Sequence, residues 1–310
     1  MSSDKKVLVT GGSGFIGSNL VDILVKNKYE VLVIDDLSSG LKENHNNKAK
    51  YLNLDLCSFI GNTKDLVKLL IKEEISTVFH LAASADVNLS INNPEKVYEI
   101  NLISSISLYN SCKKANISKF IFASTSAVYG EPDYFPVDER HKTFPISPYG
   151  LSKLAFEQFL SYSFPSSNIS NIIFRLPNVY GFRQRADLEG GVIAIFDEKM
   201  SNNEDVVIFG DGNQTRDWVN VDDIINAFYK SININYDLKI ILLGSGKETS
   251  VNELFAVLSK EKKYLKNPVF KKKRKGDIKN MVMTNSLAKD LLDWSPQINL
   301  REGLKKLSDR

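Results

Sequence analysis

Tyr149 and Lys153 place a phenol and an ammonium group four residues apart. Residues at i and i+4 are neighbours on a helix surface, and Ser147 and Pro148 supply an N-cap hydroxyl and a proline suited to the first helical position. Tyr149 is therefore expected in the first turn of a helix, with Thr125 reaching it from the end of an earlier strand. Such a trio can move a proton to or from a hydroxyl group. Because the spacing also occurs in helices that merely half-bury a tyrosine above a solvated lysine, its meaning depends on the rest of the chain.

A nucleotide-binding turn is predicted near the N-terminus. Val7–Thr10 reads as a short buried strand, and a glycine-rich segment, 11–17, and an amphipathic stretch, Ile16–Val25, follow it. Glycines let the backbone turn tightly and approach a pyrophosphate, whose charge is favoured by the free N–H groups at the start of the helix. The glycine pattern alone is weak, but a strand before it and a helix after it are the context that it requires.

A second strand, Tyr29–Ile34, ends in two acidic residues, Asp35 and Asp36, about twenty positions after the glycines. A carboxylate there can accept both ribose hydroxyls of an adenosine and would repel a 2′-phosphate, which favours NAD over NADP. The alternative is a solvated acidic turn, which applies to Asp36 more than to Asp35.

The composition fits a cytoplasmic enzyme. The 310 residues are 43% hydrophobic and 25% charged, enough for one large core or two unequal lobes. Residues 1–6 lack the apolar region of a signal peptide, and no apolar run reaches membrane-spanning length. Two cysteines exclude a disulfide framework, and three histidines show no metal-ligand spacing; His80, which follows an apolar strand, is expected to be structural. A net charge of +3 gives no reason to expect nucleic acid, and the basic run 271–275 reads as a solvated edge.

Apolar runs alternate with helical periods in the first part of the chain, which predicts a doubly wound parallel α/β sheet. Strands are expected at Val7–Thr10, Val31–Ile34, Tyr51–Leu54, Thr77–Leu81, Phe120–Ser124 and Asn171–Leu176, and helices around Phe15–Lys26, Asp65–Glu73, Glu95–Ala115 and Pro148–Ser161. After Gly181 glycine turns and short elements follow without a clear rhythm. We therefore expect a cofactor-binding lobe, 1–180, to which later segments return, and a smaller, interwoven substrate lobe, 181–310, that closes over the carboxyl ends of the strands.

The ordered motifs along almost the whole chain resemble the extended short-chain dehydrogenase/reductase family, of the NAD-dependent nucleotide-sugar epimerase/dehydratase type. The segments that carry this resemblance are 10–17, 35–37, 55–56, 80–83, Asn101, 124–130, Tyr149 with Lys153, 174–181, 209–219 and 274–278.

The resemblance implies roles for individual residues. Tyr149 would be the catalytic base, Lys153 would stabilise its phenolate and bind the nicotinamide ribose, and Thr125 would hydrogen-bond the reacting oxygen. Residues implied to contact NAD are Gly11, Gly14, Phe15, Ile16, Gly17, Asp35, Asp36, Leu37, Asp55, Leu56, Leu81, Ala82, Ala83, Asn101, Tyr149 and Lys153. Residues implied to contact the nucleotide diphosphate sugar are Thr125, Asn178, Val192, Phe209, Arg216 and Arg274. A homodimer through 95–115 and 148–161 is also implied.

One departure from the family pattern indicates the reaction. Related 4,6-dehydratases carry Asp and Glu directly after the catalytic threonine, whereas this chain has Ser126 and Ala127. Without an additional acid and base, the simplest chemistry is oxidation and re-reduction at one carbon. We therefore expect a 4-epimerase of the UDP-glucose/UDP-galactose type that acts through a transient 4-keto sugar. Met281, at a position that limits room for a 2-acetamido group, leaves the N-acetylhexosamine forms open.

The alternatives are other nucleotide-sugar enzymes of the same family, a reductase, decarboxylase or dehydratase, and a non-catalytic NAD-binding regulator. Such regulators typically lose the tyrosine or the lysine, and this chain keeps both.

Overall fold

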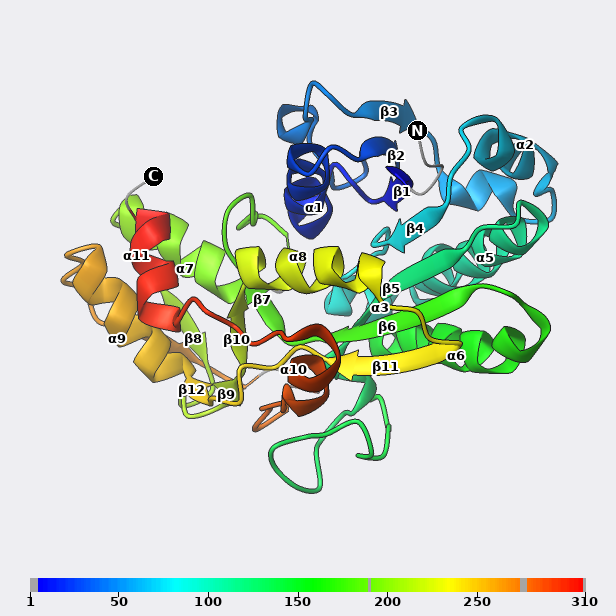
Figure 1. Ribbon diagram of the computed structural model, residues 1–310. Helices are drawn as coiled ribbons and strands as arrows, with labels where there is room; N and C mark the ends of the chain where they lie inside the picture. The colour runs from blue at the N-terminus through cyan, green and yellow to red at the C-terminus, as the bar shows by residue number, and fades with distance from the viewer. Residues whose placement is uncertain (1–4, 189–190, 274–277, 309–310) are drawn as a thin grey trace.

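The computed structural model describes residues 5–188, 191–273 and 278–308. Its centre is a seven-stranded sheet in the order β11-β6-β5-β4-β1-β2-β3, in which all neighbouring strands are parallel (Figure 1). The strands are β1 Lys6–Thr10, β2 Glu30–Asp35, β3 Lys50–Asn53, β4 Thr77–His80, β5 Lys119–Thr125, β6 Ser170–Leu176 and β11 Leu238–Leu242. The predicted doubly wound α/β sheet is therefore confirmed.

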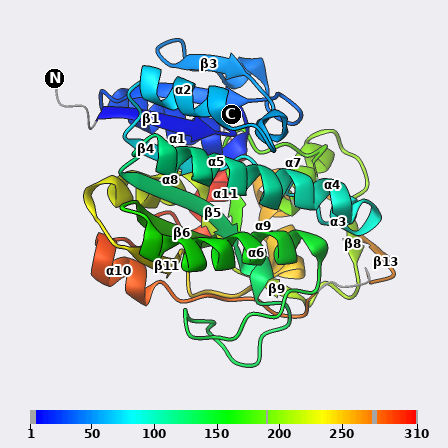
Figure 2. The ribbon, with the colours of Figure 1, turned by 90° about the vertical axis from the view of Figure 1, so that its right-hand side faces the viewer.

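Helices cover both faces of this sheet. Beneath α1 (Phe15–Lys26), α8 (Val221–Lys230) and α10 (Ser286–Leu292) lies one apolar cluster. A second cluster lies beneath α2 (Lys64–Lys72), α5 (Ser104–Lys114) and α6 (Pro148–Ser163), the helices in the foreground of Figure 2. Since both faces are covered, the central strands are apolar throughout rather than alternating, as Val7, Leu8 and Val9 in β1 illustrate.

Two elements differ from the sequence-based expectation. The helix predicted at 95–115 is divided into α4 (Pro94–Tyr98), a π-helical segment η4 (Glu99–Ile103) and α5, and a further short helix, α3 (Val87–Asn92), precedes it. Strand β11 was not predicted. It is a short edge strand whose first three residues are only half-buried, so its apolar signal is weak.

The remaining elements form a smaller unit at the carboxyl ends of β5, β6 and β11 (Figure 1). Three short strand pairs, β7 with β10, β8 with β13 and β9 with β12, pack with α7, α9 and α11 around a third apolar cluster. The bounds are β7 Asn178–Tyr180, β8 Val207–Phe209, β9 Thr215–Arg216, β10 Trp218–Asn220, β12 Thr249–Ser250, β13 Val269–Lys271, α7 Val192–Ser201, α9 Val251–Glu261 and α11 Leu300–Ser308. The short 3-10 helices are η2 Lys42–Asn44, η3 Leu56–Phe59, η5 Ser126–Val128, η6 Phe164–Ser166 and η7 Ser231–Asn233.

Candidate active site

The turn between β1 and α1 forms a helix N-terminus open to an anion. Gly11 has a φ of +71°, and its carbonyl accepts a hydrogen bond from Gly14 N at 3.2 Å. A Cβ at Gly17 would lie 2.1 Å from the Gly11 carbonyl oxygen, and a Cβ at Gly11 would lie 2.7 Å from Ala82 N, so both positions require glycine. Gly14, the N-cap residue, has no side chain that could cap the helix. The first-turn N–H groups of residues 15–17 can therefore bind a phosphate.

Asp35 ends β2 beside this turn. Its carboxylate accepts hydrogen bonds from Ser13 N and Leu37 N, each at 2.9 Å, and its residue is 9% exposed. The carboxylate thus fixes the glycine turn to the loop that follows β2 and keeps acceptor capacity for ribose hydroxyls. Leu37 itself has a φ of +60°, which directs the chain away from the sheet.

Asp36 and Asp55 are placed differently from Asp35. Asp36 is exposed and accepts hydrogen bonds from the backbone and hydroxyl of Ser38, so its carboxylate stabilises a local turn. Asp55 is exposed at the N-cap of η3, where it accepts from Cys57 N, and Leu56 behind it is buried. A direct role for these three residues in cofactor binding stays a prediction.

The segment after β4 lies against the glycine turn. Ala82 N donates to Thr10 Oγ1 at 3.2 Å, which places residues 81–83 at the carboxyl end of β1. Asn101, in the π-helical segment, is buried; its side chain bonds both backbone groups of Ser84 and donates to Ser152 Oγ at 3.1 Å. Asn101 therefore ties this segment to α6, one residue before Lys153.

His80 at the end of β4 is buried between two hydroxyl groups, as expected of a structural residue. Its ring nitrogens are each 2.7 Å from a partner, Thr10 Oγ1 and Ser105 Oγ. Burial lowers the pKa of this imidazole to about 3, so the ring is neutral.

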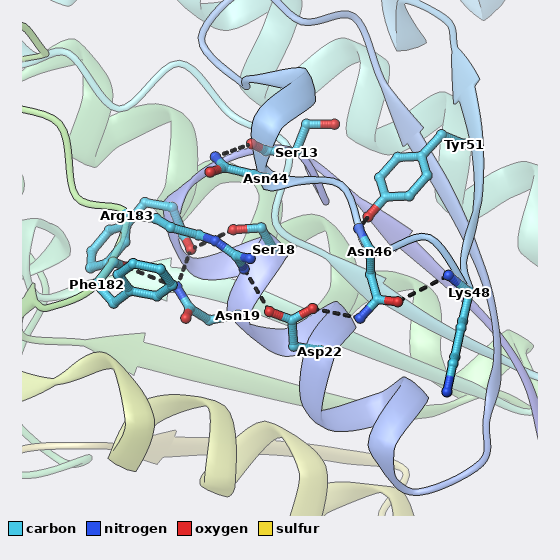
Figure 3. Close-up of polar contacts among 11 residues, drawn as sticks. Ser13, Ser18, Asn19, Asp22, Asn44, Asn46, Lys48, Tyr51, Phe182 and Arg183 are labelled. Atoms are coloured by element: carbon cyan, nitrogen blue, oxygen red, sulfur yellow. Dashed lines mark hydrogen bonds and ion pairs between the residues drawn. The ribbon is translucent and has the colours of Figure 1, made fainter.

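A polar network joins the cofactor turn to the smaller unit (Figure 3). Arg183 lies two residues after Gly181, the glycine that follows β7. Its guanidinium forms an ion pair with Asp22 of α1 at 2.7 Å. The same carboxylate accepts from Asn46 Nδ2 at 2.7 Å, and Asn44 Nδ2 donates to the carbonyl of Ser13 at 2.9 Å. One carboxylate thus connects the smaller unit, α1 and the 38–46 loop that closes over the glycine turn.

The start of helix α6, which carries Tyr149 and Lys153, lies beside the carboxyl end of β5. The Ser147 side chain accepts from Gly150 N at 3.1 Å as the N-cap, as predicted, and Tyr149 lies in the first turn. A Cβ at Gly150 would lie 2.5 Å from the Ala127 carbonyl oxygen, so the helix start packs directly on the segment after Thr125. Thr125 ends β5 close to the half-buried Tyr149 side chain. Burial raises the pKa of the phenol, and hydrogen bonding to Thr125 opposes that rise.

Lys153 lies one turn further along α6 and is 3% exposed. Its Nζ donates to the Ala123 carbonyl at 2.9 Å and lies 4.7 Å from the centre of the Phe122 ring. Burial lowers the pKa of this amine to about 7, and the negative charge of Glu157 opposes the fall. The amine is therefore held in place, but its charged form is costly unless a negative group remains nearby.

Glu157 and Arg175 were not singled out from the sequence, although both are buried beside Lys153. Arg175 Nη2 lies 2.6 Å from Glu157 Oε2. Two signals could have found them: an acidic residue four positions after Lys153 on a core-facing helix, and an arginine inside the apolar strand β6.

Four of the residues expected to bind the sugar nucleotide lie in the smaller unit: Asn178, Val192, Phe209 and Arg216. Asn178 begins β7, and its N–H donates to the carbonyl of Asp217, directly after Arg216. Both are half-buried, as are Phe209 at the end of β8 and Val192 at the start of α7. Arg216 Nη1 donates to the Thr215 carbonyl at 2.8 Å. Contact of these residues with a ligand stays a prediction, and Arg274 lies outside the described residues.

Met281 does not support an inference about sugar size. It is 1% exposed and packs in an apolar cluster with Val128, Val137 and Met283.

NAD fits the first half of this site. The open N-terminus of α1 suits a pyrophosphate, Asp35 suits the adenosine ribose, and Lys153 and Tyr149 suit the nicotinamide ribose at the carboxyl edge between β1 and β5.

Comparisons with known proteins agree with this geometry. Residues 7–240 match the NAD dependent epimerase/dehydratase family. A putative UDP-glucose 4-epimerase of Methanocaldococcus jannaschii is 41% identical over 97% of this chain and 96% of its own. The structure of a Thermotoga maritima UDP-glucose 4-epimerase with UDP-glucose has a TM-score of 0.94 and 38% identity, covering 98% of this chain and 97% of that one. A UDP-N-acetylglucosamine 4-epimerase of Methanobrevibacter ruminantium, in complex with UDP-N-acetylmuramic acid, has a TM-score of 0.92 and 35% identity, covering 99% and 97%.

The relative and the two structures match over nearly the full length of both chains, and the family match includes the glycine turn and the helix that carries Tyr149 and Lys153. The chain belongs to the NAD dependent epimerase/dehydratase family.

Proposed function

We propose that this protein is an NAD-dependent 4-epimerase that interconverts UDP-glucose and UDP-galactose. The observation that carries the proposal is the meeting of Thr125, Tyr149 and Lys153 at the carboxyl end of β5, without a carboxylate at the two positions that follow Thr125. The names of the relatives give UDP-hexoses as the substrate class.

Tyr149 is the group that takes the proton from the sugar hydroxyl at C4 and returns it. Partial burial raises the pKa of this phenol, so the phenolate needs a positive neighbour and a hydrogen-bond donor. Lys153 supplies the charge from the next turn of the helix, and Thr125 orients the reacting oxygen. NAD held by the glycine turn, Asp35 and Lys153 would supply the hydride acceptor and donor for C4.

The lack of an acidic residue at the two positions after Thr125 argues against the additional steps of a dehydratase. Ser126 and Ala127 form the 3-10 turn η5 and carry no ionisable group. A 4-keto sugar formed here therefore meets no general acid at these positions that could help to expel the C6 hydroxyl, and re-reduction at C4 is the remaining route.

Recognition of the diphosphate falls to Asn178 and Arg216, with Arg274 expected to join them. Arginine suits this role because its planar guanidinium binds two phosphate oxygens at once. Val192 and Phe209 would contact the uridine. The N-acetylhexosamine forms are a second substrate class, favoured by the similarity to the Methanobrevibacter enzyme.

We also propose a homodimer in the cytoplasm. Apolar side chains are exposed on the outer sides of neighbouring helices, Leu89 and Ile91 of α3, Ile103 of η4 and Leu151 of α6. Exposed apolar side chains on neighbouring helices are typical of subunit interfaces. In the described part of the chain, no helix has the length and apolar character needed to cross a bilayer.

The direct test is incubation of the purified protein with UDP-glucose, UDP-galactose and their N-acetylated counterparts, without added cofactor. Interconversion from both directions to one ratio supports the proposal. Accumulation of a 4-keto-6-deoxy sugar, release of carbon dioxide from UDP-glucuronate, or steady consumption of NADH would instead show a dehydratase, a decarboxylase or a reductase.

A further inference from the structure

Three ionisable side chains follow each other along one face of α6. Tyr149, Lys153 and Glu157 are spaced by four residues, so each lies one turn from the next. Glu157 is fully buried, and Arg175 of β6, 4% exposed, faces it. Arg175 Nε lies 3.1 Å from Glu157 Oε1 and 3.2 Å from Oε2, and Nη2 lies 2.6 Å from Oε2. This is a forked, charge-assisted pair inside the core.

The pair is held by two further hydroxyl groups. Ser124, next to Thr125 on β5, donates its hydroxyl to Glu157 Oε1. Arg175 Nη1 donates to Tyr129 Oη at 2.8 Å, and its guanidinium carbon lies 4.9 Å from the centre of that ring. The pair thus joins α6 to β5, β6 and η5 directly behind the catalytic residues.

Stability alone does not explain this pair. The free-energy cost of desolvating two charges offsets much of their mutual attraction. Apolar residues of similar volume would hold a helix to a sheet equally well. A buried carboxylate one turn from a buried amine does, however, change the protonation of that amine.

The charged and titratable groups around Lys153 point to Glu157 as the relevant neighbour. On its own helix, Lys153 has Tyr149 before it and Glu157 after it. From β4, His80 faces it as a neutral ring, and from β6, Arg175 is directed to the carboxylate. Of the ionisable groups that the structure describes around Lys153, Glu157 is the one whose charge favours the ammonium form.

We propose that Glu157 is a positioning residue that keeps Lys153 protonated during catalysis, and that Arg175 holds the Glu157 carboxylate in place through its forked hydrogen bonds. The inference rests on the proposed function, because it assigns Lys153 the task of stabilising the Tyr149 phenolate. Without Glu157, Lys153 loses its proton at lower pH, and the phenolate then lacks its positive neighbour.

The test is the pH dependence of kcat for Glu157→Gln, measured on holoenzyme with saturating UDP-galactose. We expect the alkaline limb to move down by about one pH unit, so that activity above the limb falls about tenfold relative to wild type, while KM changes little. An alkaline limb that coincides with that of wild type would overturn the proposal.

Two variants separate this effect from a loss of packing. Glu157→Gln combined with Arg175→Met removes both charges, avoids an unpaired buried guanidinium and should show the same displaced limb. Tyr129→Phe removes one hydrogen bond of Arg175 but leaves the pair intact, and its pH profile should match wild type. A normal profile in the double variant, or an equal displacement in Tyr129→Phe, contradicts the role given to Glu157.

A readout independent of turnover distinguishes this inference from the proposed function. In protein labelled with 13C at lysine Cε, the Lys153 signal is identified by its absence in Lys153→Met. Its titration midpoint should be lower in Glu157→Gln than in wild type. If the midpoint is lower but the protein does not epimerise UDP-sugars, the role of Glu157 is supported and the proposed function is wrong. If the midpoint is unchanged and the enzyme is active, the proposed function is supported and the role of Glu157 is wrong.

Discussion

The two ends of the cofactor site are built from different kinds of groups. At the adenosine end, which comprises the glycine turn, Asp35 and the 38–46 loop, the polar groups are backbone N–H groups and one carboxylate. At the acid–base end, which comprises Thr125, Tyr149 and Lys153, the side chains lie between a helix and the central sheet, with Lys153 buried and the other two half-buried. Fixed backbone dipoles bind without changing state, whereas desolvated side chains carry and lose protons. Substitutions at the adenosine end should therefore change cofactor affinity and selectivity. Substitutions at the acid–base end should change the turnover rate.

Tyr149→Phe should give the largest effect, a loss of turnover without a loss of NAD binding. Without the phenol oxygen the C4 hydroxyl loses its proton acceptor, and turnover should fall by roughly 10²- to 10⁴-fold, as general acid–base groups typically contribute. The NAD content of the purified protein, measured after denaturation, should equal that of wild type. Full activity in the variant would remove Tyr149 from its role, and loss of NAD would show that the ends are not separable.

Asp35→Ala should weaken cofactor binding, which Tyr149→Phe should leave unchanged. Loss of a charged acceptor for the ribose hydroxyls should weaken NAD binding by about tenfold to a hundredfold, since such a hydrogen bond contributes about 1.5–3 kcal/mol. The preference for NAD over NADP should also fall, because the charge that repels a 2′-phosphate is gone. Calorimetric titration of cofactor-free protein with both dinucleotides checks this, with exposed Asp36→Ala as the matched control. An unchanged preference argues against the ribose contact.

Lys153→Met should show how much the buried charge of Lys153 lowers the free energy of unfolding. The pKa of Lys153 is lowered to about 7 in the folded protein, so the penalty for burying its charge is fully present below pH 7 and disappears as pH rises toward the unfolded value of 10.5. The variant should be more stable than wild type by about 1 kcal/mol or more at pH 6.5, and the difference should shrink at pH 9.5. Urea unfolding of cofactor-free protein at both pH values measures it. A difference that grows with pH has the wrong sign for this explanation.

Asp22→Asn should have the smallest effect, confined to the adenosine end. The ion pair with Arg183 is partly exposed, with 40% of the aspartate side chain accessible, and such pairs contribute about 0.2–1 kcal/mol. NAD release should therefore accelerate by no more than about fivefold, with kcat at saturating NAD unchanged. Asp65→Asn, which affects an exposed pair on α2, serves as the control. A reduced kcat would mean that the network reaches the acid–base end.

The sequence predicted the local features of both ends. A strand, a glycine turn and a helix are defined by neighbouring residues, and the spacing of Tyr149 and Lys153 follows from helical periodicity, so these features needed no knowledge of the fold. The pair of Glu157 and Arg175 could not be predicted in this way, because it depends on how α6 packs against β6. The π-helical segment around Asn101 also depends on distant partners, Ser84 and Ser152. Strand β11 was not predicted because a half-exposed edge strand lacks a continuous apolar run.

The most direct test of the account follows the hydrogen at C4 of the sugar. The account predicts that UDP-glucose deuterated at C4 yields UDP-galactose with the deuterium still at C4, in H₂O and without added NAD, as NMR of the product would show. Deuterium lost to solvent, or found at C6 of a 4-keto-6-deoxy sugar, would contradict chemistry at a single carbon.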